Sequence, residues 1–328
     1  MLGVGDMALA RRVASCGAVG SFPCSGLDPH RIEKAVGGAP VAGINFNFFT
    51  HTVAEKAVSP EWLDVVRPYY EKEGVSLSEE AVLKDLQGAT TFGPEVFDTI
   101  VRLGVTVVSF HFGLPADPLW KKVKESGLTT MASATTVAEA VYLYERGVDV
   151  LILQGFEAGG HRGCFLPKST LDQQPGTFAL VPQVRRVLGE HACLVAAGGI
   201  VDKATVRAAM ALGADGVQVG TAFLLCDEVR TTAVHRAALV DARSSHRGSQ
   251  ITNILSGRPA RGLANTLMRE LGSLRQDAPA FPFGTSYLKA LRAAAESRGK
   301  SDYSSLWCGQ NLSGCQTCSV SDKIAQLF

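Results

Sequence analysis

Short apolar runs alternate with amphipathic segments along most of this chain. The apolar runs, which predict buried strands, lie at residues 18–22, 43–49, 105–112, 129–133, 148–154, 193–197 and 216–219. Segments with the apolar spacing of helices lie at residues 6–15, 29–36, 94–104, 118–126, 136–146, 182–188 and 202–212. Strands that alternate with helices of this length pair in parallel through right-handed crossovers. The pattern therefore predicts an α/β fold built on one parallel sheet.

The strand count indicates a TIM-type (β/α)8 barrel with one strand missing. Seven strands are evident in the sequence, whereas a closed barrel needs eight. We expect an N-terminally truncated barrel in which the missing strand would precede Met1, and the alternative is a natural seven-stranded open sheet. Residues 2–4 would then be the loop that follows that strand.

Two stretches depart from the alternation. Residues 52–92 are charged, show helical spacing and form an excursion between strands, with Pro60 and Pro68 as starts or breaks. After Leu225 the chain becomes rich in Arg, Ala and Ser and shows no clear strands. We therefore expect a barrel over 1–226, a small, mostly helical lid or appendage over 227–300, and a C-terminal segment over 301–328 that returns to the barrel.

Charge and hydropathy exclude several classes of partner. The 328 residues include 32 Lys plus Arg against 31 Asp plus Glu, so no basic field attracts nucleic acid. No apolar run approaches the ~18 residues that span a bilayer, and no signal-peptide pattern opens the chain. We expect a cytoplasmic protein that binds a small molecule and neither nucleic acid nor membrane. His30, His191, His235 and His246 are expected on its surface.

The eight cysteines are scattered through a large chain, which is typical of reduced thiols. The tightest spacing is Cys315–Cys318, with Cys308 upstream. Zinc would need a fourth ligand there, and no nearby His supplies one. We expect no metal site.

A glycine-rich loop follows the strand at 148–154. Its glycines permit positive φ and close approach of the backbone to a ligand, and the loop carries the titratable side chains Glu157 and His161. An imidazole with an ordinary pKa near ~6.5 can exchange a proton near neutral pH. The loop is therefore a candidate site for a flat or phosphorylated ligand, and the alternative is a tight surface turn with a solvated His.

Two more glycine elements follow the last two strands. Residues 196–200 and 218–221 lie where TIM-type barrels often bind phosphate, because backbone N–H groups converge there on an anion. Either element alone could simply turn a tight corner. Together with the His161 loop they predict a phosphorylated cofactor.

Five segments carry a resemblance to a known family. Class I nitronate monooxygenases, formerly called 2-nitropropane dioxygenases, are similar to this chain at residues 109–115, 154–163, 197–200, 212–221 and 256–262. The Glu-Ala-Gly-Gly-His sequence is shared with FMN-dependent enoyl-ACP reductases, so Ser109–Pro115 is the more discriminating segment. Family members begin with a strand that ends in a Gln-Ala-Pro-Met-like segment at the flavin. Here only Met1-Leu2-Gly3 could match its end.

The resemblance implies roles for particular residues. His161 matches the catalytic histidine, which takes a proton from the carbon beside a nitro group or positions the nitronate. Contacts to FMN are implied for Asn47, Gln154, Gly159, Gly198, Gly199, Gln218, Val219, Gly220 and Thr221. His111, at another strand end, is expected either to line the substrate pocket or to be structural. Arg162 could attract an anionic nitronate, although an Arg beside a loop is more commonly solvated.

The implied reaction is oxidation of an alkyl nitronate such as propionate 3-nitronate by O2 with bound FMN. Its products are a carbonyl compound and nitrite or nitrate. The protein is expected to be a monomer or a homodimer. One alternative is an NAD(P)H-dependent enoyl-thioester reductase. Another is an inactive truncated paralogue.

Overall fold

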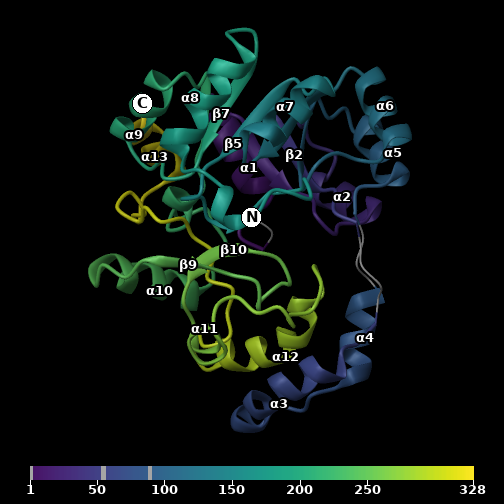
Figure 1. The fold of residues 1–328 in the computed structure, drawn as a ribbon, viewed down its shortest axis with the longest axis vertical. Coiled ribbons are helices and arrows are strands. Elements are labelled where there is room, and N and C mark those ends of the chain that lie inside the picture. Colours follow the sequence, from purple (N-terminus) through teal and green to yellow (C-terminus); the bar gives the residue numbers. More distant parts are fainter. Residues whose placement is uncertain (1–2, 53–56, 88–90) are drawn as a thin grey trace.

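A curled parallel sheet of seven strands forms the centre of the computed structural model, which describes residues 3–52, 57–87 and 91–328 (Figure 1). Its order is β1-β2-β3-β4-β5-β7-β8. The strands are β1 (Gly20–Pro23), β2 (Ile44–Phe49), β3 (Val107–His111), β4 (Thr129–Ala134), β5 (Val150–Gln154), β7 (Cys193–Ala197) and β8 (Gly216–Gln218). Every neighbouring pair is parallel. The fold is the expected TIM-type α/β architecture, present as an open barrel.

Strands β1 and β8 are the two edges of this sheet within the described residues. Of the loop expected at 2–4, residue 2 lies outside those residues. Gly3 and Val4 form a turn, and the Val4 carbonyl accepts a hydrogen bond from Arg230 N at 3.0 Å. The beginning of the described chain is thus tied to the segment that follows β8.

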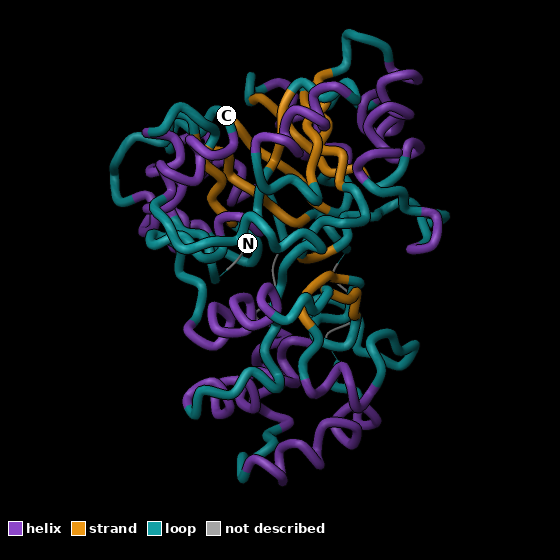
Figure 2. Tube along the Cα trace, turned by 90° about the vertical axis from the view of Figure 1, so that its left-hand side faces the viewer, coloured by secondary structure: helices purple, strands orange, loops and turns teal. Residues whose placement is uncertain are grey.

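Helices cover the outer side of the sheet, as Figure 2 shows from a second direction. Their buried apolar side chains form one core with those of the strands. They are α1 (Met7–Ser15), α2 (Pro29–Val36), α5 (Pro94–Arg102), α6 (Asp117–Glu125), α7 (Val137–Glu145), α8 (Thr177–Leu188), α9 (Lys203–Ala211) and α13 (Val320–Leu327). Local caps explain most starts: the side chains of Asp6, Asp28, Thr136, Asp202 and Ser319 each accept a backbone N–H in the first turn. The C-terminal α13 packs against α1 and α9.

Helix α8 begins at Thr177, five residues before the start at Pro182 that the sequence pattern indicated. The reason is a cap from a distant residue. The carboxylate of Glu157 accepts the Thr177 N–H at 2.8 Å and the Thr177 hydroxyl at 3.0 Å. Glu157 is therefore a helix cap that links the His161 loop to α8.

A second lobe lies below the sheet in Figure 1 and has its own apolar core. It combines α3 (Pro60–Glu73) and α4 (Glu79–Gln87) with α11 (Thr266–Leu271) and α12 (Gly284–Ser297). Tyr70 Oη donates to the Tyr287 carbonyl at 2.9 Å, and Arg298 pairs with the buried Glu73 carboxylate at 2.6 Å. The lobe thus takes residues from both sides of the boundary expected at residue 226. Pro68 lies inside α3 and does not break it.

The absence of clear strands expected after Leu225 is wrong. Strands β9 (Ser249–Thr252) and β10 (Ala260–Leu263) form an antiparallel sheet with β6 (Gly160–His161), in the order β6-β10-β9. All of β10 is buried, including its arginine. Helix α10 (Ala233–Ser244) precedes β9 and packs against β10. Because Ala260 pairs with His161, the three-stranded sheet holds the His161 loop against the second lobe.

No helix in the described part of the chain is long and apolar enough to cross a membrane.

Candidate active site at the carboxyl ends of the strands

Polar side chains from β2 and β3 meet on the inner face of the curled sheet. Asn45 and Asn47 both donate to Ser109 Oγ at 2.8 Å, whereas Phe46 and Phe48 point outward into the core. This is the alternation expected for residues 43–49. Asn45 Oδ1 is buried and accepts no hydrogen bond from the described residues. A buried amide oxygen of this kind is available to a ligand that can donate a hydrogen bond.

The His161 loop is held by side chains at strand ends. Gln154 donates from Nε2 to the His161 carbonyl at 2.9 Å and accepts from Gly163 N at 2.8 Å. His111 Nε2 lies 3.1 Å from the same His161 carbonyl. Since a carbonyl can only accept, His111 must carry its proton on Nε2. Both side chains therefore hold the loop in place through hydrogen bonds.

Arg162 is fully buried, so its expected solvation is wrong. Its guanidinium donates to Gln174 Oε1 at 2.8 Å, to the Gly155 carbonyl at 2.7 Å and to the Gln154 carbonyl at 2.9 Å. These bonds join the two ends of the loop. With its donors used in this way, Arg162 is a structural clamp.

The His161 imidazole faces a ring of aromatic side chains. The ring centroids of Phe281, Trp307, Phe49 and Phe112 lie 5.1, 5.6, 5.9 and 6.1 Å from that of His161. His161 Nε2 lies 2.9 Å from the hydroxyl oxygen of Ser256. We call these four rings with His161 the aromatic enclosure. It suits a small ligand with an apolar body and one polar end.

Three histidines around the enclosure are uncharged at neutral pH. Burial lowers the pKa of His161 to about 3 and the pKa values of His111 and His51 to about 4. The positive charge of Arg258 lowers each of them further. His51 was not singled out by its sequence, and neither of its ring nitrogens finds a partner among the described residues. The enclosure therefore presents neutral imidazoles.

These pKa values predict a loss of stability in acid. His235, whose pKa burial lowers to about 4, belongs to the same set. In the unfolded chain all four would take up protons below a pKa near ~6.5, whereas the folded protein binds them only near pH 4. The unfolded state then binds more protons, so the free energy of unfolding should fall as pH drops from about 6.5 to about 4.

Urea unfolding at pH 7.5, 6.0 and 5.0 measures this loss. The variant His191→Gln should show the same slope, because His191 is exposed. A free energy of unfolding that stays constant from pH 7.5 to 5.0 would contradict the assignment of neutral buried histidines.

The loops after β7 and β8 fit a phosphate group. Gly198 and Gly199 have φ of 117° and 74°, values that residues with a side chain rarely adopt. At Gly220 there is open space where a Cβ would lie. Among the recorded hydrogen bonds of the described residues, none uses the N–H of Gly199, Gly220 or Thr221. The two loops are adjacent because Ala197 pairs with Gln218. Free N–H groups on neighbouring glycine loops form a suitable anion cradle.

The predicted site residues fall into two adjacent groups. Asn47, His111, Gln154, Gly159 and His161 gather at the ends of β2, β3 and β5. Gly198 and Gly199 lie beside the segment Gln218–Thr221 at the ends of β7 and β8. Gly159 is packed so closely that a Cβ would lie 2.4 Å from Cys308 C. All of these residues therefore lie at the carboxyl edge of the sheet.

Sequence reasoning missed the partners of His161 that come from the second half of the chain. Ser256 and Arg258 belong to the Ser-Gly-Arg-Pro segment, which resembles the family but has no chemical pattern of its own, and Phe281 and Trp307 lie in stretches without a clear pattern. The Ser-Gly-Arg-Pro segment was the available signal, but its place beside the loop depends on the pairing of β10 with β6.

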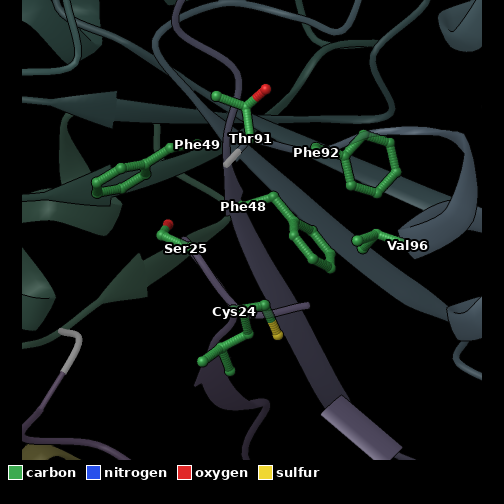
Figure 3. A pocket seen from close by; sticks show the side chains of 9 residues that line it. Cys24, Ser25, Phe48, Phe49, Thr91, Phe92 and Val96 are labelled. Atoms are coloured by element: carbon green, nitrogen blue, oxygen red, sulfur yellow. The ribbon is translucent and has the colours of Figure 1, made fainter. Parts of the chain in front are cut away.

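A small pocket opens beside the enclosure, on the β1 side (Figure 3). It is lined by residues at the ends of β1 and β2 and before α5, namely Cys24, Ser25, Gly26, Leu27, Phe48, Phe49, Thr91, Phe92 and Val96. Phe49 belongs to both the pocket and the enclosure. The pocket thus lies at the same carboxyl edge of the sheet as the enclosure, on the side of β1.

Comparisons with known proteins point to one family. A family model described as "Nitronate monooxygenase" matches residues 3–328. A nitronate monooxygenase of Paraburkholderia phytofirmans is 35% identical over 335 residues, covering 100% of this chain and 89% of the relative. One of Pseudomonas aeruginosa is 36% identical over 319 residues, covering 94% of this chain and 88% of the relative.

Among solved structures, nitroalkane oxidase from Streptomyces ansochromogenes is similar throughout. It aligns with a TM-score of 0.83 and 29% identity, over 99% of this chain and 92% of its own.

Proposed function

The chain belongs to the nitronate monooxygenase family of flavin-dependent oxidoreductases, and from that premise we propose that it oxidises alkyl nitronates of the propionate 3-nitronate type with FMN and O2. The products would be a carbonyl compound and nitrite or nitrate. The observation that carries the proposal is the neutral His161 imidazole inside the aromatic enclosure.

The residues at the carboxyl edge fit FMN. Gly199, Gly220 and Thr221 would hold its phosphate through backbone N–H groups, and Asn47, whose amide donates to Ser109 Oγ toward the end of β2, would contact the flavin ring system. Bound FMN supplies the electron transfer and the oxygen chemistry. The chain's own task is to hold the nitronate next to it and to keep water away from the reacting carbon.

His161 would contact the reacting end of the substrate. The Ser256 hydroxyl lies 3.3 Å from the Arg258 carbonyl, which can only accept its proton. His161 Nε2 must then donate to Ser256 Oγ, which leaves the lone pair of His161 on Nδ1. In this tautomer Nδ1 can take a proton from a nitroalkane carbon or accept a hydrogen bond from the substrate.

Ser256→Ala should lower kcat by roughly 3- to 10-fold, because one hydrogen bond that fixes the tautomer is lost. KM and the FMN content of the purified protein should stay unchanged, since Ser256 acts through His161. Ser244→Ala, on the exposed end of α10, is the matched control. Steady-state kinetics with propionate 3-nitronate measure the effect, and an unchanged kcat for Ser256→Ala would rule out this positioning role.

The proposed function is tested by purifying the chain, measuring its bound FMN, and following O2 consumption and nitrite release on addition of propionate 3-nitronate. We expect nitrite in proportion to nitronate consumed, without NAD(P)H. Flavin-containing protein that consumes NADH and an enoyl thioester, but no nitronate, would move the function to the reductase. Protein that binds no FMN would indicate an inactive paralogue.

A further inference from the structure

The Arg258 guanidinium lies beside the aromatic enclosure. Its guanidinium carbon lies 4.2 Å from the ring centroid of Phe112. The Phe112 ring is in turn 4.6 Å from His111, 5.9 Å from His51 and 6.1 Å from His161. Phe112 has φ of 73°, a conformation that a bulky residue rarely adopts. The Phe112 ring is thus in contact with the guanidinium and close to all three imidazoles.

The Arg258 guanidinium has donors to spare. One recorded hydrogen bond, from Nη2 to the Cys164 carbonyl at 3.2 Å, uses only one of its five N–H groups. Within residues 3–52, 57–87 and 91–328 it forms no ion pair. Stacking on Phe112 restricts its motion, so little conformational entropy remains to be lost when a ligand binds.

The other arginines near the loop differ from Arg258 in this respect. Arg162 gives its donors to three oxygen atoms of the chain, and Arg261 donates to the Phe156 and Ser249 carbonyls. The three histidines are neutral. Among the described residues, Arg258 is thus the cation available to an anionic ligand in the enclosure.

We propose that Arg258 binds the carboxylate of the substrate, so that the enzyme prefers nitronates that carry a second negative charge at the far end of a short chain. This inference rests on the proposed function and assigns the substrate's two ends. The nitronate end lies at His161, and the carboxylate end pairs with Arg258 across the Phe112 ring. A guanidinium offers two parallel donors to a carboxylate, which favours this anion over a neutral polar group.

The test compares propionate 3-nitronate with ethyl nitronate, which lacks the carboxylate. Arg258→Met should lower kcat/KM for propionate 3-nitronate by roughly 10- to 100-fold, mainly through KM, because it removes charge-assisted hydrogen bonds. The value for ethyl nitronate should change by less than about threefold, because this substrate has no carboxylate to pair with Arg258. Arg258→Lys keeps the charge and should lie between the wild type and Arg258→Met.

Arg275→Met is the matched control. Arg275 also stacks on an aromatic ring, that of Trp62 at 5.7 Å, but it is paired with Asp277 and lies in the second lobe. Its loss should leave the preference between the two nitronates unchanged. Equal losses on both nitronates in Arg258→Met, or no loss on either, would overturn the proposal.

Binding of succinate provides a readout that does not depend on turnover. Succinate has the length and the two charges of propionate 3-nitronate but cannot react. By calorimetry with the FMN-loaded protein, its Kd should rise roughly 10- to 100-fold in Arg258→Met. If the wild type oxidises no nitronate yet loses succinate binding in Arg258→Met, the proposed function fails and the anion site stands. Succinate that does not bind, or binds equally to both proteins, overturns the role of Arg258.

Discussion

Replacing His161 by Gln is expected to lower kcat for oxidation of the nitroalkane 3-nitropropionate, which must lose its α-proton, by roughly 10²- to 10⁴-fold, the range that a positioned acid–base group contributes. The glutamine amide can still contact Ser256, but it cannot take a proton. The half-buried imidazole lies among four aromatic rings, and its side chain hydrogen-bonds to Ser256. Among the described residues, no other titratable side chain lies within hydrogen-bonding distance of it. FMN content should remain that of the wild type, since none of the expected phosphate contacts involves His161.

His191→Gln is the matched control, because His191 is exposed in the turn before β7. Stopped-flow or steady-state assays with 3-nitropropionate measure kcat, and flavin absorbance measures FMN content. A His161→Gln enzyme that keeps more than about a tenth of wild-type kcat would show that the imidazole is not the acid–base group, given the usual size of that contribution.

The second large effect is expected on stability. Arg162→Met should lower the free energy of unfolding by about 2–4 kcal/mol, because buried acceptors lose their donors at a cost of about 1–3 kcal/mol each. The Gln154 carbonyl and Gln174 Oε1 bear most of this loss, since the Gly155 carbonyl also accepts from Ala158 N. The His161 loop should loosen as well, which would lower activity.

Arg186→Met on the exposed side of α8 is the comparison for Arg162→Met, with an expected change within about 0.5 kcal/mol. Urea unfolding followed by circular dichroism gives both values. Equal stabilities for the two variants would mean that the hydrogen bonds of Arg162 make no net contribution to the free energy of unfolding.

The alternation of strands and helices was predictable because it depends on local patterns. Residues 29–36 and 193–197 were predicted with the bounds that α2 and β7 have, since a cap, a proline and an apolar run mark them within a few residues. The start of α8 was missed because its cap, Glu157, lies twenty residues earlier in the chain and meets Thr177 only after the loop folds back. Strands β9 and β10 were missed because their sequences, Ser-Gln-Ile-Thr and Ala-Arg-Gly-Leu, contain no apolar run.

The candidate site was predictable in part for the same reason. Glycine loops and His161 follow strands directly, so the sequence places them at one edge of the sheet. The aromatic enclosure was not predictable, because Phe281 and Trp307 reach His161 through the packing of distant segments. His235 was expected on the surface and is buried, although its spacing with Leu239 and Ala242 on α10 was a sign of an inward face.

Anaerobic mixing of the FMN-loaded protein with propionate 3-nitronate tests the central claim most directly. If the chain is a nitronate-oxidising flavoenzyme, the visible absorption of the bound flavin should change rapidly with nitronate and return on admission of air, with nitrite released. NADH at the same concentration should cause no such change. A flavin that is bleached by NADH and left unchanged by nitronate would contradict the proposed function.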